Sequence, residues 1–83
     1  PVCPEFIVEV KSPSDSLKEL KNKMTEWMAN GVELAWLIDI EEHKVNIYHK
    51  DESHQEIENF DKKLSGGDVL PGFEFDLSLL KDE

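Results

Sequence analysis

The run EFIVEVKSPS, residues 5–14, constrains the fold of this chain more than any other stretch. Side chains on a strand alternate between its two faces. One face of this run therefore carries Phe6, Val8 and Val10, and the other carries Ile7, Glu9 and Lys11. The density of apolar residues predicts a buried strand with both faces covered. Glu9 and Lys11 then lie side by side where charge is costly, unless the two groups are paired or bind a metal.

The next segment has the pattern of one amphipathic helix. Pro13 lacks the N–H that a central strand needs, so the strand ends before it. Ser16 with Glu19 three residues later is typical of a capping box, and Gly31 suits the position after a helix end. We therefore expect a helix over about residues 16–30. Its apolar stripe has helical spacing and consists of Leu17, Leu20, Met24, Trp27 and Met28.

Later segments have the pattern of extended chain. Residues 33–40 are largely apolar and, after a strand and a helix, predict a second strand parallel to the first. Residues 45–49 alternate and predict an antiparallel partner. Residues 55–60 form a weaker strand and residues 69–77 are extended, whereas residues 61–68 are polar. The predicted fold class is α/β (α+β), with a mixed sheet in the order β-α-β-β-β and one main helix.

Length and composition limit the chain to one small domain over residues 1–83. The chain begins at Pro1 and enters a strand almost at once, so we interpret it as the C-terminal part of a larger domain that lacks its N-terminal region. No stretch has the pattern of a signal peptide or a membrane span. Cys3 is the single cysteine and cannot form an internal disulfide. We therefore expect a cytoplasmic protein and an incidental role for this thiol.

The charge balance opposes a nucleic-acid-binding surface within these residues. The net charge is −10, and the chain contains lysine but no arginine. Contacts to phosphate usually rely on both residue types, so an acidic chain without arginine is poorly suited to bind a polyanion. Any nuclease hypothesis has to overcome this objection.

Several motifs nevertheless share their order and spacing with a known family. They are residues 4–15, Lys23, Gly31-Val32, Trp36-Leu37-Ile38-Asp39 and Leu70-Pro71-Gly72-Phe73. With these motifs the chain resembles, over nearly its whole length, the Uma-type family of putative endonucleases, which is abundant in cyanobacteria. That family belongs to the restriction-endonuclease-like, PD-(D/E)xK superfamily. The V-E-V-x-S-P-S-D run is the most specific part of the resemblance, whereas Glu-x-Lys alone arises often by chance.

The resemblance implies a site and a reaction. Glu9 would be the metal-binding carboxylate of the (D/E)xK motif and Lys11 its lysine. Lys23 would be a further lysine near the site. Mg²⁺ or Mn²⁺ would be held by Glu9 and the backbone carbonyl of Val10, and DNA would be the substrate of the full-length protein.

The same resemblance implies that the site is incomplete. The first acidic residue of the superfamily lies on a preceding strand, which would be upstream of Pro1. Pro4-Glu5 is similar to the expected pair, but it shares a strand with Glu9 and is not interpreted as the catalytic acid. The implied function is a metal-dependent DNA endonuclease, present here as an inactive fragment.

Each candidate residue also has a purely structural interpretation. Glu9 and Lys11 form an ion pair with each other on a half-exposed strand, and Lys23 is a solvated helix lysine beside Glu19 or Trp27. Three histidines lack the spacing of a zinc site and are interpreted as surface residues: His43, His49 and His54. Two acidic pairs are interpreted as solvated turn charges: Glu41-Glu42 and Asp51-Glu52.

A second function hypothesis is a nuclease fold without activity that serves as a module for protein interaction or assembly. The acidic charge and the lack of arginine favour this alternative, whereas the motif of Glu9 and Lys11 favours the enzyme. In either case the first strand would lack a neighbour on one side, and a bare strand edge pairs with other chains. We therefore expect a homodimer with two-fold symmetry.

Overall fold

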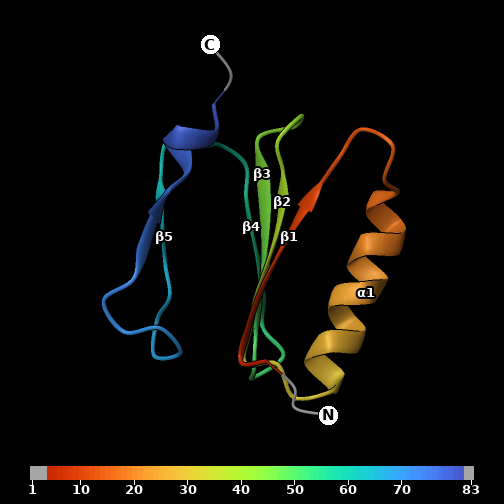
Figure 1. Ribbon diagram of the computed structural model, residues 1–83, viewed down its shortest axis with the longest axis vertical. Helices are drawn as coiled ribbons and strands as arrows, with labels where there is room; N and C mark the ends of the chain where they lie inside the picture. The colour runs from red at the N-terminus through yellow and green to blue at the C-terminus, as the bar shows by residue number, and fades with distance from the viewer. Residues whose placement is uncertain (1–3, 82–83) are drawn as a thin grey trace.

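A mixed sheet between two unlike layers forms the framework of the computed structural model, which describes residues 4–81. Its elements in chain order are β1 (Phe6–Lys11), α1 (Leu17–Ala29), β2 (Leu34–Asp39), β3 (Lys44–His49), β4 (His54–Ile57), β5 (Lys63–Ser65), β6 (Glu74–Asp76) and the 3₁₀ helix η1 (Leu77–Leu80). Figure 1 shows α1 on one side of the sheet and the segment from β5 to η1 on the other. The expectation for Cys3 lies outside the described residues. Within residues 4–81 no helix has the length and apolar character needed to cross a membrane.

The main sheet has four strands in the order β1-β2-β3-β4. β1 and β2 are parallel, and β3 and β4 continue the sheet with antiparallel pairing. The predicted mixed sheet and the helix between its two parallel strands are therefore confirmed. The register sets Glu9 beside Leu37 and Lys11 beside Asp39, so the carboxyl ends of β1 and β2 lie at the same end of the sheet.

A second sheet, formed by β5 and β6, is not predicted by the sequence. β5 lies within residues 61–68, whose polar composition has no strand pattern. Its central residue Leu64 is only 2% exposed and belongs to the same core as Phe60 and Leu77. Tertiary packing rather than its own pattern stabilises so short a strand, and a single sequence gives little sign of it.

Both ends of α1 are fixed by the residues that the sequence indicates. The Ser16 hydroxyl accepts a hydrogen bond from the Glu19 N–H at 3.3 Å. At the other end Gly31 has a φ of 107°, which a residue with a side chain rarely adopts. The N–H groups of Gly31 and Val32 each donate to a carbonyl in the last turn at 3.2 Å, the pattern of a Schellman motif. The helix therefore begins and ends one residue inside the predicted limits.

Hydrophobic cores form on both faces of the sheet, and β2 is buried throughout. The core under α1 consists of Leu20, Met24, Val32, Ala35 and Leu37. The core on the other face is larger and joins β2 and β3 to residues such as Phe60, Leu64 and Leu77. The expectation that both faces of β1 are covered is wrong, because Val8 is 43% and Val10 is 48% exposed. The layer from β5 to η1 covers β2 and β3 and leaves these two valines open.

The stability of α1 should depend on its N-cap. Ser16→Ala removes the oxygen that accepts from the Glu19 N–H, and we expect the free energy of unfolding to fall by about 0.5–2 kcal/mol. The measurement is urea denaturation followed by circular dichroism. Ser14→Ala is the matched control, because the Ser14 hydroxyl lies before the helix and contacts the Ser12 hydroxyl at 3.3 Å. Equal midpoints for the two variants would contradict the capping role of Ser16.

Candidate functional site

Charged side chains gather at the end of the sheet where β1 and β2 finish. The parallel register places the last residue of β1, Lys11, beside the last residue of β2, Asp39. From this end α1 runs back along one face of the sheet (Figure 1), and the turn between β2 and β3 follows directly after Asp39. The residues that meet here, called the charged cluster below, are Glu9, Lys11, Lys23, Asp39 and Glu41.

Glu9 and Lys23 come together between β1 and α1. Glu9 Oε2 lies 3.3 Å from Lys23 Nζ. Lys23 stands at the margin of the buried helix stripe, next to Met24. The Glu9 side chain is 28% exposed and that of Lys23 is 49% exposed, so water reaches both groups. Lys23 is therefore not a lysine that contacts only its own helix, because its partner lies on a strand.

Lys11 pairs with the turn between β2 and β3. Its side chain is 12% exposed, and its Nζ lies 3.4 Å from Glu41 Oε1 and 3.3 Å from the carbonyl oxygen of Ser12. The interpretation in which Glu9 and Lys11 pair with each other is wrong, because each has a partner on a different element. Glu41 is also more than the solvated turn charge that the sequence suggests.

Asp39 is the member of the charged cluster that sequence reasoning missed as a functional position. It is 3% exposed, and its Oδ1 accepts a hydrogen bond from the Glu42 N–H at 3.2 Å. This contact closes the turn that presents Glu41 to Lys11. The signal that could have found it is the parallel pairing itself, which brings the last residues of two successive strands to one end of the sheet.

The backbone of β1 is paired on one side within residues 4–81. The Glu5 carbonyl accepts from the N–H groups of Glu33 and Leu34, at 3.0 and 3.1 Å. Backbone groups of successive residues in a strand point to opposite sides, so the odd-numbered residues of β1 face β2. The backbone groups that point away from β2 belong to Phe6, Val8 and Val10. This side is called the outer edge of β1 below.

The donors that a divalent metal would need are present in part. Within residues 4–81 no group of three or more His, Cys, Asp or Glu side chains is arranged to hold a metal ion. The Glu9 carboxylate is accessible to water, and the Val10 carbonyl points to the outer edge. Both are hard oxygen donors of the kind that Mg²⁺ prefers. These residues fit Mg²⁺ as part of a donor set that needs further carboxylates.

A tight turn fixes the path from β1 to α1. Asp15 Oδ2 accepts hydrogen bonds from the N–H and the hydroxyl of Ser12, both at 2.9 Å. The Asp15 N–H in turn donates to the Ser12 carbonyl at 3.0 Å. The hydrogen bond from the Ser12 N–H, and after it the one from the hydroxyl, lowers the pKa of Asp15 below its usual value. The ionised carboxylate thus holds the turn that leads into the helix bearing Lys23.

The histidines lie on β3, β4 and the turn before β3, outside the charged cluster. His43 stacks on Phe60 and His54 stacks on Tyr48, each with ring centroids 4.7 Å apart. His43 and His49 are half-buried, so the expectation of surface residues is correct for His54 alone of the three. Their contacts are explained by packing and hydrogen bonds within the β3–β4 region.

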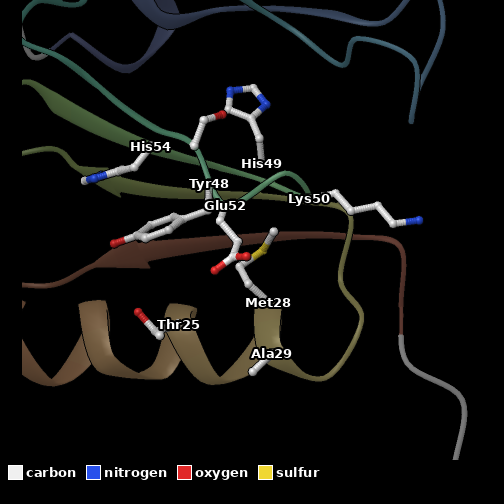
Figure 2. Close-up of a pocket in the computed structure, with 9 residues that line it drawn as sticks. Thr25, Met28, Ala29, Tyr48, His49, Lys50, Glu52 and His54 are labelled. Carbon is white, nitrogen blue, oxygen red and sulfur yellow. The ribbon is translucent and has the colours of Figure 1, made fainter.

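A hollow of about 480 Å³ lies between the C-terminal half of α1 and the β3–β4 hairpin. Figure 2 shows Tyr48 and Glu52 between the hairpin and Met28, whereas Lys50 points away from the helix. Partial burial raises the pKa of the Tyr48 phenol, so this group stays protonated at neutral pH. None of the site residues predicted from the sequence lines this hollow, and the charged cluster remains the candidate site.

Comparisons with known proteins confirm the resemblance noted in the sequence. A family model, Uma2, described as a putative restriction endonuclease, matches residues 1–79. The fold is similar to that of a putative nuclease of DUF820 from Anabaena variabilis, with a TM-score of 0.83 and 19% sequence identity. The match covers 96% of this chain and 45% of that one, so the chain spans less than half the length of that protein. The comparison with curated proteins gives no match.

The turn between β1 and α1 should make the stability of the fold sensitive to acid. Folding lowers the pKa of Asp15, so its contribution is fully present above the pKa of the unfolded chain, about 3.9. This contribution is lost as the pH falls through the lower pKa of the folded state. Asp15→Asn should therefore lower the urea midpoint at neutral pH, and its deficit should shrink at a pH below about 3.9.

The control for this measurement is Asp68→Asn, which changes an exposed carboxylate in the turn between β5 and β6. Its midpoint should follow that of the unchanged protein at both pH values. A deficit of Asp15→Asn that has the same size at neutral and acid pH would show that the charge of Asp15 does not hold the turn.

Proposed function

Because the chain belongs to the Uma2 family of putative restriction endonucleases, we propose that it carries the Glu-x-Lys half of a metal-dependent nuclease site. Glu9 and the Val10 carbonyl bind Mg²⁺ or Mn²⁺, Lys11 acts on the phosphate, and Lys23 supports Glu9. The reaction is hydrolysis of a DNA phosphodiester by a longer protein that contains this chain. The observation that supports the proposal best is the meeting of Glu9, Lys11 and Lys23 at the end of β1.

The side chains have distinct tasks in this proposal. Glu9 offers a carboxylate that water can reach, and Lys23 at 3.3 Å keeps it oriented. Lys11 is held by the Ser12 carbonyl and by Glu41, so its ammonium group is already fixed and can stabilise charge that develops on a phosphate. The metal, when bound, would polarise the phosphate and lower the pKa of the attacking water.

Lys11 has to exchange a partner to act on a phosphate. Its present partner Glu41 is 53% exposed, and ion pairs with such exposure contribute about 0–1 kcal/mol. A phosphate group carries negative charge and accepts hydrogen bonds in the same way as a carboxylate. Replacement of Glu41 is therefore inexpensive, and the ion pair keeps the lysine oriented until the substrate arrives.

A second candidate function is a nuclease fold without activity that serves in protein interaction or assembly. The net charge of −10 and the lack of arginine favour it, because such a surface repels DNA. The exposure of Val8 and Val10 also favours a protein partner. The two candidates differ in whether Glu9 and Lys11 are required for cleavage of DNA.

The isolated chain of 83 residues should be inactive. It offers one carboxylate at the proposed metal position, and Mg²⁺ gives up its waters reluctantly for so few protein ligands. We expect no nicking of supercoiled plasmid with Mg²⁺ or Mn²⁺, and only weak Mg²⁺ binding in a calorimetric titration. Nicking by the pure chain that disappears in Glu9→Gln would contradict the expectation of an incomplete site.

A longer protein that contains this chain should nick or cut plasmid DNA when a divalent metal is present. Glu9→Gln removes the charge of the proposed metal ligand, and Lys11→Ala removes the ammonium group. Each change should lower the rate by about 100-fold or more while the circular dichroism spectrum stays unchanged. Matched controls are Glu56→Gln on β4 and Lys63→Ala on β5, because both residues are exposed and lie outside the charged cluster.

The outcomes separate the two candidate functions. Cleavage that survives Glu9→Gln would remove Glu9 from the site. A folded longer protein that cleaves no substrate with any of the metals would favour the interaction module. Loss of cleavage in the two control variants as well would mean that the changes act through folding rather than through the site.

A further inference from the structure

The outer edge of β1 offers unpaired backbone groups to a partner. Within residues 4–81 β1 is the last strand of the sheet, and the backbone groups of Phe6, Val8 and Val10 point outward. The strand has six residues and contains no proline. Natural edge strands are commonly protected by proline, a bulge or an inward-pointing charge, and the outward-facing positions of β1 have none of these.

Apolar surface continues from this edge toward the second sheet. A groove of about 190 Å³ lies between β1 and the segment from β6 to η1, and its lining is entirely apolar. Its outer wall includes Val8 at 43% and Val10 at 48% exposure, and its opposite wall includes Phe73 at 42% exposure. Phe6 packs on Trp36 at the floor, with ring centroids 4.9 Å apart. The edge and the groove together form one surface that favours burial.

We propose that β1 of this chain pairs with β1 of a second copy, in antiparallel orientation about a two-fold axis at Val8. In this register Val8 lies opposite Val8, and Phe6 lies opposite Val10. On the other face of the extended sheet, Glu5 of each copy lies opposite Lys11 of its partner. The backbone groups that point outward in one copy meet those of the other, so the sheet continues through the dimer.

The charge pattern selects this register among the symmetric alternatives. A shift of the axis to Glu9 would place Glu9 opposite Glu9, and a shift to Ile7 would place Glu5 opposite Glu9. Like charges directly opposite each other destabilise a strand pair, whereas opposite charges stabilise it. A shift of the axis by two residues, to Phe6 or Val10, would leave most of β1 without a partner strand. The axis at Val8 pairs two opposite charges and keeps the longest overlap.

The apolar face favours the same arrangement. With the axis at Val8, every outward-facing residue of β1 lies opposite another apolar residue, and the two grooves join across the axis. The helix layer leaves room for the second copy, because α1 packs over β2 and β3. Closure of the two grooves on each other covers Val8 and Val10, which the second sheet leaves open.

The proposed dimer is independent of the proposed nuclease function. Pairing uses backbone groups at the outer edge, whereas Glu9 and Lys11 project from the face that carries α1. A chain without any nuclease role would present the same edge and the same valines. Failure of the cleavage experiments would therefore leave the dimer untouched, and a monomeric chain would leave the site untouched.

Sedimentation equilibrium of the chain tests the association, with Val8→Lys as the disrupting variant. The unchanged chain should be a dimer at concentrations of tens of micromolar and above. Val8→Lys places two ammonium groups on the axis, and lysine on an edge strand opposes pairing, so this variant should be a monomer with an unchanged circular dichroism spectrum. Leu79→Lys is the matched control, because Leu79 is 74% exposed on η1 and lies away from the edge.

Disulfide cross-linking tests the register. In a Cys3→Ser background, Val8→Cys places two thiols opposite each other, with Cα atoms about 5.5 Å apart and within disulfide range. Val10→Cys is the matched control, because the two thiols would lie four residues apart along the strands, about 14 Å, and cannot bond. Under mild oxidation Val8→Cys should give a covalent dimer on a non-reducing gel, and Val10→Cys should remain a single chain.

Four results would overturn the proposal. A monomer at all concentrations would exclude the dimer, and a monomer with β1 amides protected from hydrogen exchange would place another segment on the edge. A dimer that persists in Val8→Lys would place the interface elsewhere. Faster cross-linking of Val10→Cys than of Val8→Cys would move the two-fold axis away from Val8.

Discussion

The parallel pairing of β1 with β2 is the constraint on which the rest of the structure depends. Parallel neighbours need a crossover, and α1 with its two caps supplies it. The same pairing aligns the ends of both strands, so Lys11 and Asp39 become neighbours although 28 positions separate them in the chain. The turn after β2 then brings Glu41 to Lys11, and the return of α1 brings Lys23 to Glu9. An antiparallel pair would place these groups at opposite ends of the sheet.

The ion pairs of the charged cluster orient side chains more than they stabilise the fold. Glu9, Lys23 and Glu41 are all partly exposed, and such pairs contribute about 0–1 kcal/mol each. Burial of apolar residues such as Met24 and Trp36 accounts for far more of the stability. Charges that add little to stability can be exchanged for a substrate or a metal at little cost, which suits a binding site better than a structural one.

Local signals explain which parts of the fold the sequence predicts. Ser16 and Gly31 mark the helix ends because a cap and a positive φ are properties of single residues, and the family motif names Glu9, Lys11 and Lys23 directly. Three features depend instead on contacts between distant segments. They are the strand β5, the contact of Glu41 with Lys11, and the exposure of Val8 and Val10. A buried pattern in β1 does not tell whether a neighbour is present to bury it.

The outer edge of β1 connects the proposed site with the proposed dimer. A carboxylate that completes a metal site around Glu9 and the Val10 carbonyl would have to come from beyond this edge, because the inner edge is occupied by β2. In the two-fold pairing, the residue opposite Glu9 is Ile7 of the second copy, which offers no oxygen donor. Glu5 of the second copy lies opposite Lys11 and neutralises it. Pairing with a second copy would therefore cover the edge without completing the site, and a strand with an acid opposite Glu9 would do both.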